Sequence, residues 1–152
     1  MPPITVVVAD HDKASCAACV RLLEPLKGVA VVGKARSVPE VVRAARLKPR
    51  ILLLDLTLSR SNHLPVLPVI RHESPRTKVI LLTRRVSERR ILDALAQGAP
   101  GYLEKRSLHE HLAKAVRVVA AGEAWVPRRM IAKIVDRLAR LNARVEGARA
   151  AK

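Results

Sequence analysis

Residues 4–10 read ITVVVAD, an apolar and mostly β-branched run that ends on an acid. The run is shorter than an average helix of about 11 residues, and its continuous apolar character is typical of a strand buried on both faces. The segment ILLLD at residues 51–55 repeats this pattern, and KVILLT at residues 78–83 ends on a threonine instead. Three such segments predict central strands of a parallel sheet that helices cover on both faces.

Two shorter runs, at residues 29–32 and 101–103, complete a set of five expected strands. The expected helices cover residues 13–26, a stretch opened by Ser37, a stretch from Ser87 to Gly98, and a stretch from Ser107 to about Ala121. Ser37 and Ser107 each stand three residues before a glutamate, which is the spacing of a capping box. Pro68 lacks the N–H that a helix interior uses, so the helix after the third strand must start late or bend. Strands that alternate with helices indicate βαβ units and an α/β fold.

The 152-residue chain carries 29 Lys and Arg against 13 Asp and Glu, a formal net charge of +16. Its length fits one compact domain, and an apolar content of 49% is enough to build a core. The apolar runs fall short of the ~20 residues of a membrane span, and residues 1–4 show no secretory signal. Cys16 and Cys19 are too few for a disulfide scaffold and are interpreted as small buried residues. We expect a cytoplasmic protein whose surface attracts polyanions or acidic partners and does not enter a membrane.

Four polar side chains follow four of the expected strands. Asp10, Asp55, Thr83 and Lys105 each stand at or just after the carboxyl end of a strand. Because such ends meet at one edge of a parallel sheet, the four side chains are expected to share one crevice. Two carboxylates suit Mg²⁺, whereas an ammonium and a hydroxyl suit an arriving anion. This combination is typical of phosphoryl transfer, in which a carboxylate can also serve as the nucleophile.

The chain resembles the receiver domain of bacterial two-component response regulators over residues 4–121. The resemblance rests on VAD at residues 8–10, LLD at 53–55, LT at 82–83 and GYLEK at 101–105. VVAAGEAW at residues 118–125 is similar to the NarL/FixJ-type branch, whose members usually add a helix-turn-helix. The resemblance implies a flavodoxin-like (βα)5 fold, a doubly wound parallel sheet with strand order 2-1-3-4-5. We expect residues 1–123 to form this receiver and residues 124–152 to form a basic amphipathic helix and tail, without room for a helix-turn-helix.

The resemblance also implies roles for single residues. Asp55 would accept a phosphoryl group from a sensor histidine kinase, and Lys105 would contact the phosphoryl oxygens. Asp10, Asp55 and the backbone carbonyl of Thr57 would hold Mg²⁺. Thr83 would turn toward the phosphate and open a space into which Tyr102 rotates, so that one face of the domain changes shape. The protein would act in phosphorelay signalling and transcription regulation, with no enzymatic activity beyond phosphorylation and dephosphorylation of its own aspartate.

Two positions depart from the family pattern. His11 stands where the family has a second acid, and imidazole is a poor ligand for Mg²⁺, so we expect weak or absent Mg²⁺ binding. Arg84 stands where the family has a small residue, so it could cover the phosphate site, pair with Asp55 or replace the metal. Two hypotheses remain open: a receiver that is still phosphorylated on Asp55, and a phosphorylation-independent receiver that acts as an interaction module for proteins or nucleic acid.

The C-terminal segment shows two helical stripes. One stripe is apolar and the other is basic; they comprise Ile131, Ile134, Leu138, Leu141 and Val145, and Lys133, Arg137, Arg140 and Arg144. Their spacings of three and four residues place each stripe on one helix face. Such a helix could lie on its own receiver, form the seam of a homodimer, or present its basic face to an acidic protein or, without sequence specificity, to DNA.

Overall fold

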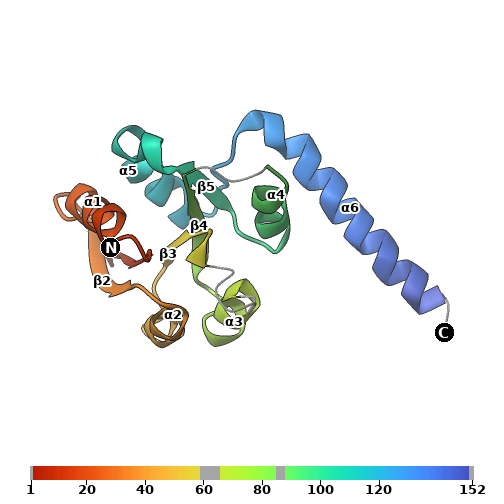
Figure 1. Cartoon of the computed structure of the whole chain (residues 1–152), viewed down its shortest axis with the longest axis horizontal. Helices are drawn as coiled ribbons and strands as arrows, with labels where there is room; N and C mark the ends of the chain where they lie inside the picture. The colour runs from red at the N-terminus through yellow and green to blue at the C-terminus, as the bar shows by residue number, and fades with distance from the viewer. Residues whose placement is uncertain (1, 59–65, 85–87, 151–152) are drawn as a thin grey trace.

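A computed structural model describes residues 2–58, 66–84 and 88–150 (Figure 1). Strands and helices alternate along the chain, as the apolar runs predict. In order they are β1 (Ile4–Ala9), α1 (Lys13–Leu23), β2 (Val29–Ala35), α2 (Val38–Ala45), β3 (Ile51–Asp55), α3 (Val66–Glu73), β4 (Lys78–Thr83), α4 (Glu88–Ala96), β5 (Gly101–Glu104), the short 3-10 helix η2 (Lys105–Ser107), α5 (Leu108–Ala120) and α6 (Arg128–Ala150).

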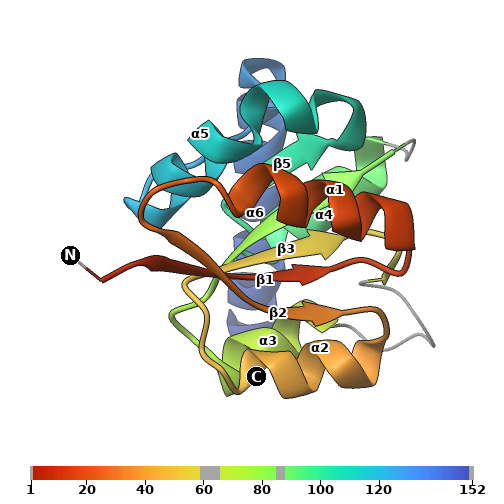
Figure 2. The same cartoon turned by 90° about the vertical axis from the view of Figure 1, so that its left-hand side faces the viewer.

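The five strands form one parallel sheet in the order β2-β1-β3-β4-β5. Alternate side chains of the strands enter two separate clusters. One cluster packs against α1 and α5, and the other packs against α2, α3 and α4. Figure 2 shows the sheet edge-on between these two helical layers. The predicted flavodoxin-like fold and strand order are confirmed.

Several predicted boundaries shift for local reasons. Helix α1 ends at Leu23 instead of residue 26, and β2 continues to Ala35 instead of residue 32. The Ser37 cap forms, because its hydroxyl accepts a hydrogen bond from the Glu40 N–H. The capping box predicted at Ser107 is wrong: η2 precedes α5, and the Ser107 side chain makes no capping hydrogen bond. The predicted cap at Ser87 lies outside the described residues.

The expectation that Pro68 makes the helix after β3 start late or bend stays a prediction, because α3 is described over Val66–Glu73 and residues 59–65 lie outside the described residues. Other sequence-based expectations agree with the structure. Cys16 and Cys19 are free and buried. Among the described residues, no helix combines the length and apolar character that crossing a bilayer requires.

The segment after α5 is fastened to the edge of the sheet. The Trp125 N–H donates to the Pro100 carbonyl, and the Trp125 carbonyl accepts from the Tyr102 N–H, both at 2.9 Å. Helix α6 then packs against α4 through Met130, which is 1% exposed, and half-buried Ile134. Beyond this contact α6 extends past the body of the domain (Figure 1). The first half of α6 therefore lies on its own receiver.

Candidate functional site

The structure brings the four strand-end side chains together. Asp10 follows β1, Asp55 ends β3, Thr83 ends β4, and Lys105 follows β5. Asp55, Thr83 and Lys105 line an open pocket of about 230 Å³, together with His11, Asp12, Leu56, Thr57 and Arg84. Asp10 is fully buried behind this pocket. Asp55 can thus be reached from solvent, although its side chain is only 5% exposed.

Lys105 neutralises both acids. Its Nζ donates a hydrogen bond of 2.6 Å to Asp55 Oδ2 and lies 2.7 Å from Asp10 Oδ2. The second contact is an ion pair without hydrogen-bond geometry, so Asp10 Oδ2 is held by charge alone. All three side chains are at most 8% exposed, and water screens them little. The ammonium therefore occupies the position between the carboxylates that another cation could take.

The two acids differ in proton affinity. Burial raises the pKa of Asp55, but hydrogen bonds from Lys105 and Thr57 outweigh burial and bring that pKa from 3.8 to about 2. Burial also raises the pKa of Asp10, and Lys105 offsets only part of this effect. The pKa of Lys105 is raised because its pairing with the two carboxylates outweighs its own burial. Asp55 is thus ionised and the ammonium of Lys105 remains charged, which is the state a nucleophilic carboxylate needs.

Thr57 holds the other oxygen of Asp55. Its hydroxyl donates at 2.6 Å and its N–H at 2.7 Å, both to Asp55 Oδ1. Sequence reasoning assigned a role only to the Thr57 carbonyl and missed the hydroxyl. The signal for it was present, because a threonine two residues after a strand-end acid can close a short side-chain turn.

His11 completes a group of possible metal ligands with Asp10 and Asp55, whose ligand atoms lie within 4.8 Å of one another. His11 Nδ1 is 3.9 Å from Asp10 Oδ1 and 3.8 Å from Asp55 Oδ2. Two carboxylates suit Mg²⁺, but an imidazole nitrogen does not, and Lys105 already balances much of the negative charge. The residues present therefore do not match an all-oxygen Mg²⁺ site.

Arg84 does not contact Asp55. Its guanidinium donates at 2.5 Å to Asp12 Oδ2 and at 3.2 Å to the Ser15 hydroxyl. The prediction that Arg84 pairs with Asp55 is wrong, because its guanidinium pairs with Asp12 at the N-cap of α1. That Arg84 covers the phosphate site or replaces the metal stays a prediction, and Arg84 does line the pocket that contains Asp55. Asp12 itself accepts from the N–H groups of Ala14 and Ser15. An acid directly before a helix is an N-cap signal, and it could have revealed this role.

Tyr102 is already buried. It is 6% exposed, packs in the same cluster as Met130, and its hydroxyl donates to Glu104 at 3.3 Å. Burial raises the pKa of the Tyr102 phenol, and a hydrogen bond with Thr83 acts in the opposite direction. Thr83 and Tyr102 are thus neighbours, as a switch pair requires. The rotation of Tyr102 after a movement of Thr83 stays a prediction.

Two of the four residues in the basic stripe of α6 form ion pairs with α4. Lys133 pairs with Glu88 and Arg137 pairs with Asp93, both on α4. The apolar stripe is divided as well, because Ile134 packs on the core, while the other members, Ile131, Leu138, Leu141 and Val145, are 41–52% exposed. Sequence reasoning did not single out Met130, which anchors the helix. The other two members of the basic stripe make no ion pair with α4: Arg140 pairs with Asp136 on α6 itself, and Arg144 makes no ion pair within the described residues.

Comparisons with known proteins identify relatives of the chain. The family model described as "Response regulator receiver domain" matches residues 6–117. The uncharacterized transcriptional regulatory protein YxjL of Bacillus subtilis is 32% identical over 107 residues, which cover 70% of this chain and 49% of YxjL. The nitrate/nitrite response regulator protein NarL of Escherichia coli is 30% identical over 122 residues, which cover 80% of this chain and 56% of NarL.

A solved structure shows the same arrangement. The signal receiver domain of the putative response regulator NarL from Mycobacterium tuberculosis superposes with a TM-score of 0.72 at 29% sequence identity. The match covers 81% of this chain and all of that domain. By contrast, this chain spans about half the length of the two curated relatives.

Proposed function

Because the chain belongs to the response regulator receiver domain family, we propose that it works in two-component signalling by accepting a phosphoryl group on Asp55. The supporting observation is the state of that carboxylate. Its pKa is lowered to about 2, it lines an open pocket, and Lys105 stands 2.6 Å away to meet the incoming charge. Family members receive the group from sensor histidine kinases, and we propose the same class of donor for this chain.

The proposed step is a displacement at phosphorus. A carboxylate oxygen of Asp55 forms a bond to phosphorus as the phosphorus–nitrogen bond of the donor phosphohistidine breaks, and the leaving imidazole takes a proton from solvent. Asp55 then carries an acyl phosphate, and Lys105 shifts from the carboxylate to the phosphoryl oxygens. The Thr83 hydroxyl is placed at the same pocket to donate a hydrogen bond to the phosphoryl group.

Both curated relatives are described as regulators, YxjL of transcription and NarL of the response to nitrate and nitrite. We propose a role in transcription regulation for this chain as well. Helix α6 and the Thr83–Tyr102 pair would carry the change of shape to a partner.

A phosphorylation-independent receiver is the second candidate. Two observations favour it: Lys105 already lies within 2.7 Å of both acids, where a divalent cation would otherwise lie, and Tyr102 is already buried. In this case Asp55 would stay paired with Lys105, and the domain would act by binding a partner through a fixed surface.

Mass spectrometry after treatment with acetyl phosphate distinguishes the two candidates. The first predicts one added phosphoryl group, about 80 Da, on the intact protein and none on Asp55→Asn. Asp136→Asn is the matched control, because Asp136 lies on α6 and pairs only with Arg140; it should be modified like the wild type. Failure to modify the intact protein, with the E. coli relative modified in parallel, would refute phosphorylation and leave the second candidate.

A further inference from the structure

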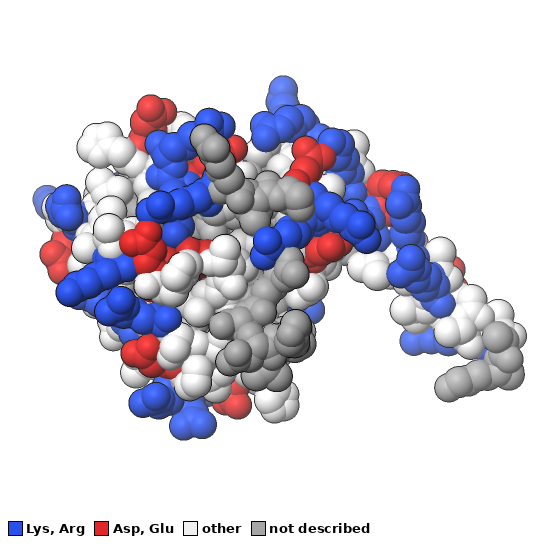
Figure 3. All heavy atoms as spheres, in the orientation of Figure 1, with Lys and Arg blue, Asp and Glu red and all other residues white. Residues whose placement is uncertain are grey.

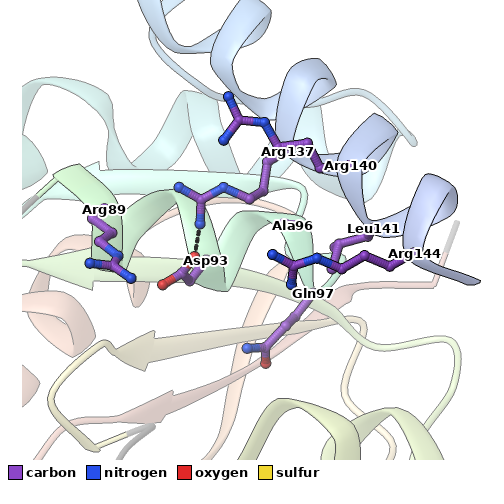
Figure 4. A pocket seen from close by; sticks show the side chains of 8 residues that line it. All are labelled: Arg89, Asp93, Ala96, Gln97, Arg137, Arg140, Leu141 and Arg144. Atoms are coloured by element: carbon purple, nitrogen blue, oxygen red, sulfur yellow. Dashed lines mark hydrogen bonds and ion pairs between the residues drawn. The ribbon is translucent and has the colours of Figure 1, made fainter.

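A second hollow lies between α4 and α6, away from the Asp55 pocket. It has a volume of about 560 Å³ and shares no lining residue with that pocket. Its lining is mainly basic: Arg89, Asp93, Ala96 and Gln97 come from α4 and its C-terminal end, and Arg137, Arg140, Leu141 and Arg144 come from α6. We name it the arginine groove. Figure 4 shows Arg137 and Arg144 extending from α6 toward α4.

The positive charge of the arginine groove is only partly balanced. Arg137 pairs with Asp93, and Arg140 pairs with Asp136 on its own helix. Within the described part of the chain, Arg89 and Arg144 make no ion pair. Four guanidinium groups thus face two carboxylates, which leaves an excess of two positive charges in one concavity. Figure 3 shows Lys and Arg side chains along α6 and beside α4, in keeping with this excess.

One end of the arginine groove is held in place by contacts within the chain. Met130 is 1% exposed and anchors the start of α6 in the core below α4. The Lys133–Glu88 and Arg137–Asp93 ion pairs join the same part of α6 to α4. This end of the groove therefore loses little conformational entropy when a ligand binds.

We propose that the arginine groove binds an oligophosphate, that is, a short chain of phosphates joined by anhydride bonds, free or as part of a nucleotide. Guanidinium groups form paired hydrogen bonds with phosphate oxygens, and two unpaired arginines match two or more phosphate groups. The volume lies within the range of about 300–1,000 Å³ found for small-ligand sites. Exposed Leu141 and half-buried Ala96 provide a limited apolar surface next to the arginines.

The direction of the side chains favours a small ligand over a DNA duplex. Arg137 and Arg144 extend toward α4 and not outward from α6 (Figure 4). The phosphates of a duplex lie on a convex surface that would meet the outer face of α6. A short oligophosphate can enter the concavity and contact both helices at once, which would strengthen the attachment of α6 to the receiver.

Isothermal titration calorimetry with inorganic tripolyphosphate tests the proposal on the full chain. We expect saturable binding that weakens at least tenfold in Arg89→Ala and in Arg144→Ala. Arg43→Ala is the matched control, because this exposed arginine lies on α2, which packs on the same face of the sheet as α4 but contributes no residue to the arginine groove. It should bind within twofold of the wild type. Circular dichroism should show all three variants folded, because the three side chains are exposed.

ATP, orthophosphate and a short DNA duplex complete the experiment. Equal affinity for ATP and tripolyphosphate, or a preference for ATP, supports the proposal and identifies whether the base contributes. An equal loss of tripolyphosphate binding in Arg43→Ala would overturn it, because diffuse surface charge would then explain the binding. Duplex binding that requires Arg89 and Arg144, with no tripolyphosphate binding, would also overturn it and assign the surface to nucleic acid. Failure of Asp55 phosphorylation would not affect any of these outcomes.

Discussion

Replacing Lys105 with methionine should strongly destabilise the domain, because it removes the buried ammonium that contacts both Asp10 and Asp55. The ammonium lies 2.6 and 2.7 Å from the two carboxylates, and its side chain is 8% exposed. Removing one partner from such a buried group costs about 3–5 kcal/mol. For a domain of this size, each kcal/mol lowers the melting temperature by about 2–4 °C, so we expect a decrease of about 6–20 °C.

Urea denaturation followed by circular dichroism at pH 7 measures this cost, with Lys13→Met as the control, because Lys13 is an exposed lysine at the start of α1. Adding Asp10→Asn to Lys105→Met should recover at least half of the loss, because one uncompensated charge is removed. The deficit in unfolding free energy should also shrink as the pH is lowered from 7. The pKa of Asp10 is already raised by burial, and without Lys105 it rises further, so protonation at lower pH relieves the repulsion.

A decrease of less than about 1 kcal/mol in the free energy of unfolding of Lys105→Met would refute this reasoning. So would an Asp10→Asn, Lys105→Met double variant no more stable than Lys105→Met alone. Either result would mean that water or ions reach the acids and that Lys105 does not hold the site together.

Three further predictions concern other parts of the molecule. As the pH falls from about 4 to about 2, the free energy of unfolding of the wild type should decrease by roughly 2 kcal/mol more than that of Asp55→Asn, because a carboxyl with a lowered pKa stabilises the fold only while it is ionised. Urea denaturation midpoints measured across this pH range test the prediction. Parallel curves for the two proteins would contradict it. His11→Asp should raise the Mg²⁺ affinity measured by calorimetry at least tenfold, because an oxygen ligand replaces a nitrogen. The control His109→Asp, on α5, should leave the affinity unchanged. Equal Mg²⁺ affinities for His11→Asp and the wild type would mean that His11 is not at a ligand position. Met130→Ala should lower the free energy of unfolding by about 2–4 kcal/mol and speed tryptic cleavage of α6. Ile131→Ala is the control and should change both quantities little, because the Ile131 side chain is 47% exposed. Unchanged cleavage in Met130→Ala would show that the helix is held by its ion pairs alone.

The location of the candidate site was predictable because parallel topology constrains it. Once β1, β3, β4 and β5 are recognised as parallel strands, their carboxyl ends must meet at one edge. Asp10, Asp55, Thr83 and Lys105 follow from this rule, and the structure brings them into one pocket region. Side-chain pairing within that region was less predictable. Arg84 lines the same pocket as Asp12 and Asp55, and its pairing with Asp12 depends on distances that sequence spacing does not set.

Boundaries and helix faces were harder to predict because tertiary contacts decide them. The Ser107 spacing satisfies a capping box, but η2 supplies the preceding turn and leaves that side chain without its capping bond. The stripes on α6 were visible from their spacing, but their division between α4 and solvent was not. It depends on Met130, a residue outside both stripes, which fixes where the helix contacts the core.

The two hydrogen bonds made by Trp125 have a further consequence for the sheet. β5 is an edge strand, and an edge with free N–H and carbonyl groups can recruit a strand from another molecule and start aggregation. Trp125 occupies part of that edge from within the same chain, at the Pro100 carbonyl and the Tyr102 N–H. A change that pulled this short connection away would therefore do more than release α6: it would uncover a surface suited to intermolecular β-pairing. Variants of Trp125 should consequently be screened for self-association before any signalling defect in them is interpreted.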